Sequence, residues 1–421
     1  MKTVLITPHI CRPWPLSEGG GPQRTMLMRN ALRQFGEVCV VVATPCTDGS
    51  SQERREVDGL QQIFYDAARE TGMFRALQLV LRGDLRRVAK NLAIYSADFS
   101  LADRSSSEQL RRIIREFQPE LVVCRLLPWA VATGAAFIND VPVILDFDDV
   151  DWRVHESRVE QMAEHGAVRR LHGRLVRQIV ERNARKCLRR FAHVFVASEE
   201  DRSVVGLQSC SVLPNVPILP EADGGDGPGE SSNEPSILFV GSLGNPRNAQ
   251  GLDHFLDHVW PDLHRAAPDL KLRLVGPLPD DESASVARWR KMPNVEVVGL
   301  VEDIGVEYER ALFTVAPVYW GGGTKVKVLE TLGRGRTCVL TPHAVYGLGH
   351  YVKHGDSLLC AETDAEFVQC CLKLVKSDSL RRSLATRGRK IIREHFSIAR
   401  FNSAVARVVA RFAEAHQGVG A

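Results

Sequence analysis

The sequence predicts an α/β protein built from two parallel-sheet domains in tandem. Two series of short, β-branched apolar runs alternate with longer stretches of helical periodicity. Continuous apolar strands separated by helices form parallel sheets covered on both faces, so each series predicts one Rossmann-like domain. Between the two series lies a segment rich in proline, glycine and serine, which predicts a flexible connection.

The expected strands lie at ten places. Those of the first series are residues 4–6, 38–42, 121–123, 143–145 and 194–196. Those of the second series are residues 237–240, 272–275, 295–298, 313–316 and 338–340. We therefore expect an N-terminal domain over residues 1–215, a linker over 216–235 and a C-terminal domain that begins at 236. Ligands of open parallel sheets bind beyond the carboxyl ends of the strands, so the residues after each strand are the candidates for function.

Composition excludes several classes of protein. The chain has 421 residues with 44% hydrophobic and 25% charged residues, as in ordinary folded, water-soluble proteins. Its net charge of +3 gives no reason to expect nucleic acid as a partner. The ten cysteines include no C-x-x-C pair, and the N-terminus reads directly into a strand without a secretory signal. We expect a cytoplasmic protein with no transmembrane segment.

A glycine loop follows the first predicted strand. Gly19, Gly20 and Gly21 precede Arg24 and a helical run over residues 25–35. Such a loop at a helix N-terminus exposes backbone N–H groups, which suits a phosphate. The loop matches neither the dinucleotide fingerprint nor the P-loop. A plain turn is the alternative.

A second glycine-rich segment follows the predicted strand 313–316. Residues 321–323 are glycines, and Thr324 is the expected N-cap of a helix that runs to residue 332. Lys327 and Glu330 share a helical face, so a cation could meet a diphosphate while the carboxylate accepts hydrogen bonds from ribose hydroxyls. The alternative is a simple intrahelical ion pair on a solvated face.

Residues 321–330 resemble the donor-binding motif of retaining nucleotide-sugar glycosyltransferases with the GT-B fold, family 4 type. Further matches lie at residues 239–242 with 246–248, at 274–276 and at 297–303. The resemblance implies two domains facing a cleft, with a nucleotide sugar bound by the C-terminal domain over 236–395 and an acceptor by the N-terminal domain. It also implies retention of anomeric configuration, no cofactor or metal, and a helix over 396–421 that crosses back to the N-terminal domain.

The resemblance also implies roles for single residues. Glu330 would hold the donor ribose, and Arg247, Lys325 and Lys327 would face the diphosphate. Two glycines, Gly276 and Gly299, would lie near the nucleobase. The candidate donor-binding residues are Gly20, Gly21, Arg24, Ser242, Arg247, Gly276, Gly299, Gly322, Gly323, Thr324, Lys325, Lys327 and Glu330.

Two positions depart from the family pattern. Gly322 stands where many members carry an acidic residue that contacts the sugar. Ser242 stands where many carry an arginine, so the usual arginine and lysine clamp on the phosphate is incomplete. We expect Lys325 and Lys327 to compensate for the lost cation.

An acidic cluster, residues 146–151, follows the predicted strand 143–145. Clustered carboxylates could hold Mg²⁺. The resemblance favours instead an acceptor-orienting or base role for Asp148 or Asp149, with helix N-capping by Asp149 or Asp151 as the alternative. The candidate catalytic residues are Asp148, Asp149 and Lys325.

The remaining signals concern histidines and basic helices. His9 could line the cleft and His343 could approach the donor sugar, but for both we expect solvated positions in loops. Residues 74–92 and 169–190 predict arginine-rich helices that either pack on a sheet or contact a membrane surface. The acceptor is therefore left open among a saccharide, a lipid-linked molecule and a small molecule. A sugar-nucleotide epimerase and a catalytically silent nucleotide-sugar-binding protein remain alternative functions.

Overall fold

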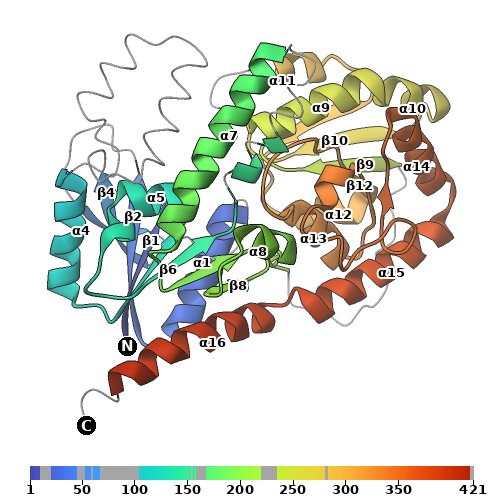
Figure 1. The fold of residues 1–421 in the computed structure, drawn as a ribbon. Helices are drawn as coiled ribbons and strands as arrows, with labels where there is room; N and C mark the ends of the chain where they lie inside the picture. Colours follow the sequence, from blue (N-terminus) through green and yellow to red (C-terminus); the bar gives the residue numbers. More distant parts are fainter. Residues whose placement is uncertain are drawn as a thin grey trace. The chain divides into compact units, whose positions relative to one another are not determined.

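The structure is a computed structural model of the chain. It describes residues 1–9, 20–44, 53–57, 60–66, 104–150, 152–154, 156–157, 167–219, 235–279 and 283–417. The chain divides into two compact units, which Figure 1 shows in sequence colours. Unit 1 comprises Met1–Asn215 and Ile398–Ala421, and unit 2 comprises Val216–Ser397.

Within the described residues, unit 1 contains an eight-stranded sheet in the order β3-β4-β2-β1-β5-β6-β7-β8. All neighbouring strands are parallel except β3 and β4, which form an antiparallel pair at one edge. The strand order reverses between β1 and β5, which is where ligands of such sheets bind. The strands are β1 (Lys2–Thr7), β2 (Glu37–Thr44), β3 (Glu53–Val57), β4 (Leu60–Asp66), β5 (Leu121–Arg125), β6 (Val143–Phe147), β7 (His193–Val196) and β8 (Cys210–Val212).

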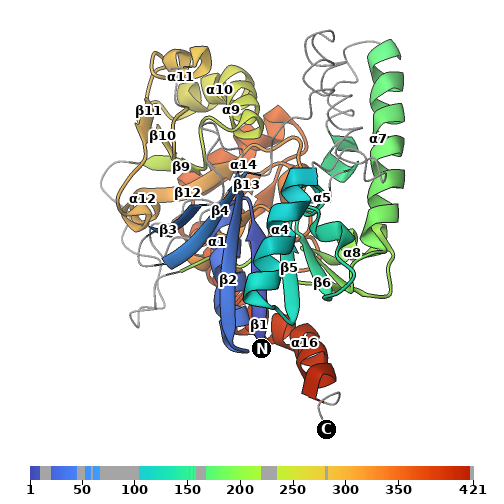
Figure 2. The same cartoon turned by 90° about the vertical axis from the view of Figure 1, so that its left-hand side faces the viewer.

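Helices cover both faces of this sheet. On one face, Met26 packs with Val40 and Val42 of β2. On the other, Val4 and Ile6 of β1 belong to a buried cluster to which helices α4, α5 and α7 contribute. The last helix of the chain, α16, packs against α1 (Figures 1 and 2). The helices are α1 (Gly20–Arg33), α4 (Arg104–Phe117), α5 (Leu127–Ala132), α7 (Ala167–Leu188), α8 (Glu199–Val205) and α16 (Ile398–Gln417).

Unit 2 has a six-stranded sheet within the described residues, in the order β11-β10-β9-β12-β13-β14, with every neighbouring pair parallel. Its order reverses between β9 and β12. The strands are β9 (Ser236–Val240), β10 (Lys271–Val275), β11 (Val295–Gly299), β12 (Ala311–Ala316), β13 (Cys338–Leu340) and β14 (Leu359–Cys360). The helices are α9 (Pro246–His258), α10 (Trp260–Ala266), α11 (Ala284–Trp289), α12 (Ile304–Arg310), α13 (Val326–Gly333), α14 (Asp364–Lys376) and α15 (Asp378–His395).

The core of unit 2 holds α9 close to the strand ends. Phe255 of α9 lies 5.4 Å from Phe367 of α14, measured between ring centroids, and both pack in one cluster with Phe239 of β9. A Cβ on Gly251 of α9 would lie only 1.9 Å from the carbonyl oxygen of Pro317. The helix therefore approaches the segment after β12 at a distance that only glycine permits.

The predicted α/β class with two Rossmann-like parallel sheets is confirmed, and each of the ten predicted strands lies within or overlaps a strand of the structure. The sequence did not predict β3, β4, β8 or β14. The sheet of unit 1 is also not wholly parallel, because β3 is antiparallel to β4. The predicted basic helix over 74–92 and linker residues 220–234 lie outside the described residues. Among the helices of the described part, none is long and apolar enough to cross a membrane.

Candidate functional site

Three glycines form turns where strands of unit 2 end. Gly241 follows β9, Gly276 follows β10, and Gly299 is the last residue of β11, with φ angles of 149°, 139° and 81°. A Cβ on Gly276 would lie 2.2 Å from the carbonyl oxygen of Gly241, so the first two turns are in direct contact. Backbone rather than side chains therefore forms these strand ends, and a ligand can approach the main chain closely.

The second glycine segment, residues 321–323, follows β12. His343 Nε2 donates a hydrogen bond to the carbonyl oxygen of Gly321 over 2.8 Å. Lys325 Nζ donates to the carbonyl oxygens of Gly322 and Gly323 at 2.7 and 2.8 Å. The Lys325 ammonium therefore holds the glycine segment in place at the start of α13.

The structure corrects the predicted cap of this helix. Helix α13 begins at Val326, and its N-cap residue is Lys325 rather than Thr324, which is buried. Within the described residues, the Lys325 side chain makes no capping hydrogen bond. The first turn of α13 consequently keeps N–H groups that no N-cap side chain satisfies, beside the positive end of the helix dipole.

Lys327 of α13 reaches back to the end of β9. Its Nζ lies 2.9 Å from Asn248 Oδ1, to which it donates, and 4.1 Å from the centroid of the Phe239 ring. Asn248 Nδ2 in turn donates to the carbonyl oxygen of Ser242 over 2.8 Å. Burial, together with the nearby Lys325 ammonium, lowers the pKa of Lys327 to about 7. Ser242 thus contributes its backbone to a network that ends in a cation.

Arg247 supplies a second cation at the start of α9. Its guanidinium carbon lies 5.6 Å from the centroid of the Trp320 ring, a cation–π contact. A Cβ on Gly321 would lie 2.8 Å from Arg247 Cδ, so the arginine packs directly on the glycine segment. The side chain of Asn245 caps α9 by accepting from the Arg247 backbone N–H over 2.9 Å. Glycine segment, Arg247 and Lys327 are therefore brought together around the switch point between β9 and β12.

Glu330 lies one turn further along α13. Its carboxylate accepts from Arg334 Nε over 3.2 Å, and its side chain is 12% exposed. Burial raises the pKa of Glu330 above its usual value. The ion pair that the sequence suggested between Glu330 and Lys327 is not the arrangement found, since Lys327 bonds to Asn248 instead.

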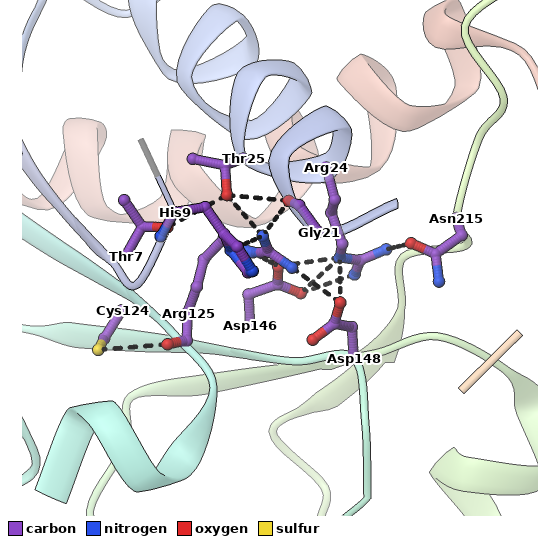
Figure 3. A network of polar contacts seen from close by, with 10 residues as sticks. All are labelled: Thr7, His9, Gly21, Arg24, Thr25, Cys124, Arg125, Asp146, Asp148 and Asn215. Atoms are coloured by element: carbon purple, nitrogen blue, oxygen red, sulfur yellow. Dashed lines mark hydrogen bonds and ion pairs between the residues drawn. The ribbon is translucent and has the colours of Figure 1, made fainter. Parts of the chain in front are cut away.

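The first glycine loop differs from the expectation. Helix α1 begins at Gly20, so Gly20 and Gly21 lie in its first turn rather than in a loop before residue 25, and Gly19 lies outside the described residues. Arg24 is only 2% exposed and donates to Asp146 through Nε and Nη2, at 2.9 and 2.6 Å (Figure 3). The predicted phosphate contact of Arg24 is therefore replaced by a buried ion pair inside unit 1.

Arg125, the last residue of β5, completes this network (Figure 3). It donates to Asp146 Oδ2 at 2.9 Å, to Asp148 Oδ2 at 2.7 Å and to the carbonyl oxygen of Gly21 at 2.6 Å. Although burial acts to raise it, the two arginines hold the pKa of Asp146 below its usual value. The carboxylate of Asp146 is thus ionised and fully engaged.

Asp148 has a different environment. Its Oδ2 accepts from Arg125, but its buried Oδ1 has no hydrogen-bond partner among the described residues. Burial raises the pKa of Asp148 to about 6. Asp149 is partly exposed beside it, and the suggested capping by Asp151 falls on a residue that the structure does not describe. In the described part of the chain, no group of three or more His, Cys, Asp or Glu side chains could hold a metal ion.

Neither histidine is a solvated loop residue. His343 is half-buried and bonded to Gly321. His9, also half-buried, accepts through Nδ1 a 3.4 Å hydrogen bond from Arg125 Nη1, and burial beside this arginine lowers its pKa to about 4. Both predictions were wrong because loop position alone says nothing about which side chains cover a residue.

Sequence reasoning missed Arg125, Asn248 and Trp320 as members of these clusters. Arg125 lies two residues after the predicted strand 121–123, which pairs with β1, and this position at the switch point could have singled it out. Asn248 is the third residue of α9, a position in the first turn from which it meets Lys327. Trp320 carries no sequence signal beyond its place before the glycines.

Comparison with known proteins identifies a family model that matches unit 2 and a curated relative. Residues 234–377 match the family model described as glycosyl transferases group 1. A curated relative, an uncharacterized 44.6 kDa protein in the cps region of Klebsiella pneumoniae, is 25% identical over 175 residues. That alignment covers 40% of this chain and 45% of the relative, so this chain spans less than half of the relative's length.

Solved structures share the fold at low identity. Sucrose-phosphate synthase from Thermosynechococcus elongatus has a TM-score of 0.69 at 13% identity, covering 98% of this chain and 99% of that one. HepE of Anabaena, in complex with UDP, has a TM-score of 0.61 at 13% identity, covering 98% and 100%. The fold of these proteins and the family match over unit 2 together support a glycosyltransferase with the GT-B fold.

Proposed function

We propose that the chain transfers a hexosyl group from a nucleotide sugar to an acceptor, with retention of anomeric configuration, as a family 4 type enzyme. One observation carries this proposal: the N-terminus of α13, whose N-cap side chain makes no capping bond, lies with Lys327 and Arg247 at the strand switch point of unit 2. Backbone N–H groups, a helix dipole and two cations suit a diphosphate. The group 1 family match over the same residues supports it.

The leaving diphosphate is the group that this arrangement would stabilise. Negative charge grows on it as the glycosidic bond breaks, and cations fixed beforehand lower the energy of that state. Lys327 and Arg247 would supply the charge, with Lys325 holding the glycine segment, so no metal cofactor is required. The Glu330 carboxylate would accept hydrogen bonds from the ribose, and the turns at Gly276 and Gly299 would lie beside the nucleobase. HepE was solved with UDP and with UDP-glucose, which makes uridine nucleotides the first donors to test.

Unit 1 would bind the acceptor, which we take to be a saccharide, a lipid-linked molecule or a small molecule. Asp148 and Asp149 follow β6, beside the switch point of the unit 1 sheet, and would orient the acceptor hydroxyl or remove its proton. We place the reaction in the cytoplasm and, for a lipid-linked acceptor, propose peripheral contact of the protein with the inner membrane surface. All eight cysteines of the described residues are free thiols, which fits a reducing compartment.

A thermal-shift panel of nucleotides and nucleotide sugars tests this function. A ligand at 100 times its dissociation constant stabilises the folded protein by about 2.7 kcal/mol. We expect UDP or another nucleoside diphosphate to stabilise the wild type and to stabilise Glu330→Gln less. Glu362→Gln, a change at an exposed residue outside the matched segments, is the matched control. No stabilisation by any nucleotide would contradict the donor site.

Products then distinguish the reaction types. Incubation of the stabilising nucleotide sugar with methyl glycosides should yield a glycoside and the free nucleoside diphosphate. An epimerase would instead change the sugar without an acceptor, and a silent binding protein would leave the donor intact. Activity should persist in EDTA, whereas loss in EDTA with recovery on addition of Mg²⁺ or Mn²⁺ would contradict the metal-independent reaction.

A further inference from the structure

One buried guanidinium in unit 1 contacts both segments by which the chain leaves and re-enters that unit. Arg24 Nη1 donates to Asn215 Oδ1 over 3.0 Å (Figure 3), and Asn215 is the last residue of unit 1 before the chain enters unit 2. The ring centroid of Phe401 lies 5.8 Å from Arg24 Cζ. Phe401 belongs to the first turn of α16, the helix with which the chain returns to unit 1.

The same guanidinium holds the carboxylates that follow β6. Asp146 accepts from Arg24 and from Arg125, while Arg24 Nε lies 3.7 Å from Asp148 Oδ2. Arg125 Nη2 lies 2.7 Å from the same Asp148 oxygen. Asp148 is therefore held on one side by two arginines, and its other oxygen, Oδ1, is buried without a hydrogen-bond partner in the described part of the chain.

A contribution to the stability of the folded protein is a weak explanation for this buried network of arginines and carboxylates. Removing charged groups from water is expensive, and well-packed apolar residues often stabilise a protein as well as a buried ion pair does. A guanidinium, however, presents its donors in a rigid plane, so its partners are held in fixed directions relative to one another. Asn215 and Asp146 accept hydrogen bonds from Arg24, and the ring of Phe401 makes a cation–π contact with the same guanidinium. A shift of either crossing segment would therefore turn the carboxylates.

We propose that Arg24 is a positioning residue that orients Asp148 toward the acceptor hydroxyl according to the placement of the two crossing segments. The proposal rests on the proposed function, in which Asp148 serves the acceptor. Arg24 itself touches no substrate. It follows that changes at Asn215 or Phe401, which both contact the Arg24 guanidinium, alter the step that involves the acceptor and leave donor binding intact.

The test avoids replacing Arg24, because its loss would leave the buried Asp146 carboxylate without two of its hydrogen bonds. Asn215→Ala removes one hydrogen bond from the guanidinium, and Phe401→Leu removes the ring that contacts it. Val409→Ala is the control, since Val409 is also fully buried in α16 but lies two turns beyond Phe401. Each change is combined with Asp148→Asn in a double-mutant cycle on the unfolding equilibrium.

In the Asn215 and Phe401 cycles, we expect the unfolding constant of the double variant to differ more than threefold from the value that the two single variants predict. The Val409 cycle should be additive within about twofold, as is usual for separate sites. Additive behaviour in all three cycles would overturn the proposal, because Asn215 and Phe401 would then not communicate with Asp148.

Hydrolysis of UDP-glucose, with water as the acceptor, gives the functional readout. We expect Asn215→Ala to lower kcat about fivefold, the rate equivalent of about 1 kcal/mol for one hydrogen bond, with an unchanged dissociation constant for UDP. An unchanged kcat in Asn215→Ala and Phe401→Leu would leave Arg24 as a structural partner of Asp146 only. If the wild type binds no UDP and shows no hydrolysis, the uridine donor fails, and the double-mutant cycles still decide the role of Arg24.

Discussion

The ammonium of Lys327 lies 4.1 Å from the centre of the Phe239 ring, so a cation from α13 rests on an aromatic side chain of β9. The contact places the charge at the end of β9, where Gly241 leaves room for it. It also takes the ammonium out of water, and burial together with Lys325 lowers the pKa of Lys327 to about 7. This lysine is therefore only partly protonated near neutral pH until an anion arrives.

Nucleotide binding should consequently take up a proton. A diphosphate beside Lys327 favours the charged form and raises its pKa, so above pH 7 affinity for UDP should fall as pH rises, by up to tenfold per unit. Calorimetric titrations of UDP at pH 8 in buffers of different ionisation enthalpy measure this proton directly. Lys327→Met should abolish the dependence on buffer. A binding enthalpy that is the same in all buffers for the wild type would contradict the prediction.

Glu330→Gln should weaken donor-nucleotide binding by about 1.5–3 kcal/mol, the range for hydrogen bonds to charged groups. Glutamine keeps an acceptor for Arg334, so the fold should survive the change better than with alanine. Titration of UDP into the folded variant measures the loss, and circular dichroism checks the fold. Wild-type affinity in a folded Glu330→Gln protein would exclude Glu330 from the donor site.

Gly276→Ala should destabilise unit 2 by about 2 kcal/mol or more, because the new Cβ would meet the Gly241 carbonyl oxygen at 2.2 Å with φ at 139°. Gly349→Ala is a matched control, since no atom lies within 4 Å of a Cβ placed there. Chemical unfolding of both variants gives the comparison. Equal stability of the two would mean that the turns at Gly241 and Gly276 are not in contact in solution.

The pH dependence of stability should carry the signature of Asp148. Burial raises its pKa in the folded protein to about 6, above the usual value of 3.8, so the folded state favours the protonated form. The stabilisation present below pH 4 is then lost as pH rises through 6. Relative to Asp148→Asn, the wild type should lose up to about 3 kcal/mol between pH 4 and 7. Parallel stability curves for the two proteins over this range would contradict the raised pKa.

The sequence predicted the strands that are buried and β-branched, because such runs carry a signal of their own. It missed β14, which has two residues, and β8, which has three, since elements this short are defined by their neighbours. It also missed β3, whose sequence Glu-Arg-Arg-Glu-Val is mostly charged and pairs only as an edge strand.

The donor-side residues were predictable because they lie close together in sequence, in 321–330. The network of Arg24, Arg125 and Asp146 was not predictable in the same way. Arg24 lies 122 residues before Asp146, and Arg125 lies 21 residues before it. The three side chains meet because β5 and β6 are neighbours in the sheet and α1 follows β1, which pairs with β5. Their burial reversed the expectation for Arg24, which a glycine-rich context had suggested to be exposed to a ligand.

Unit 1 is begun first during synthesis and completed last. Its helix α1 packs against α16, which buries Phe401, Val405 and Val409 completely, yet α16 follows all of unit 2 in the chain. As the chain leaves the ribosome, the apolar face of α1 stays without its partner until the final helix has emerged, whereas unit 2 is continuous in sequence and can form beforehand. A stop codon before Ile398 would therefore leave unit 2 intact, and unit 1, although it is synthesised first, would stay incomplete and exposed to chaperones and proteases.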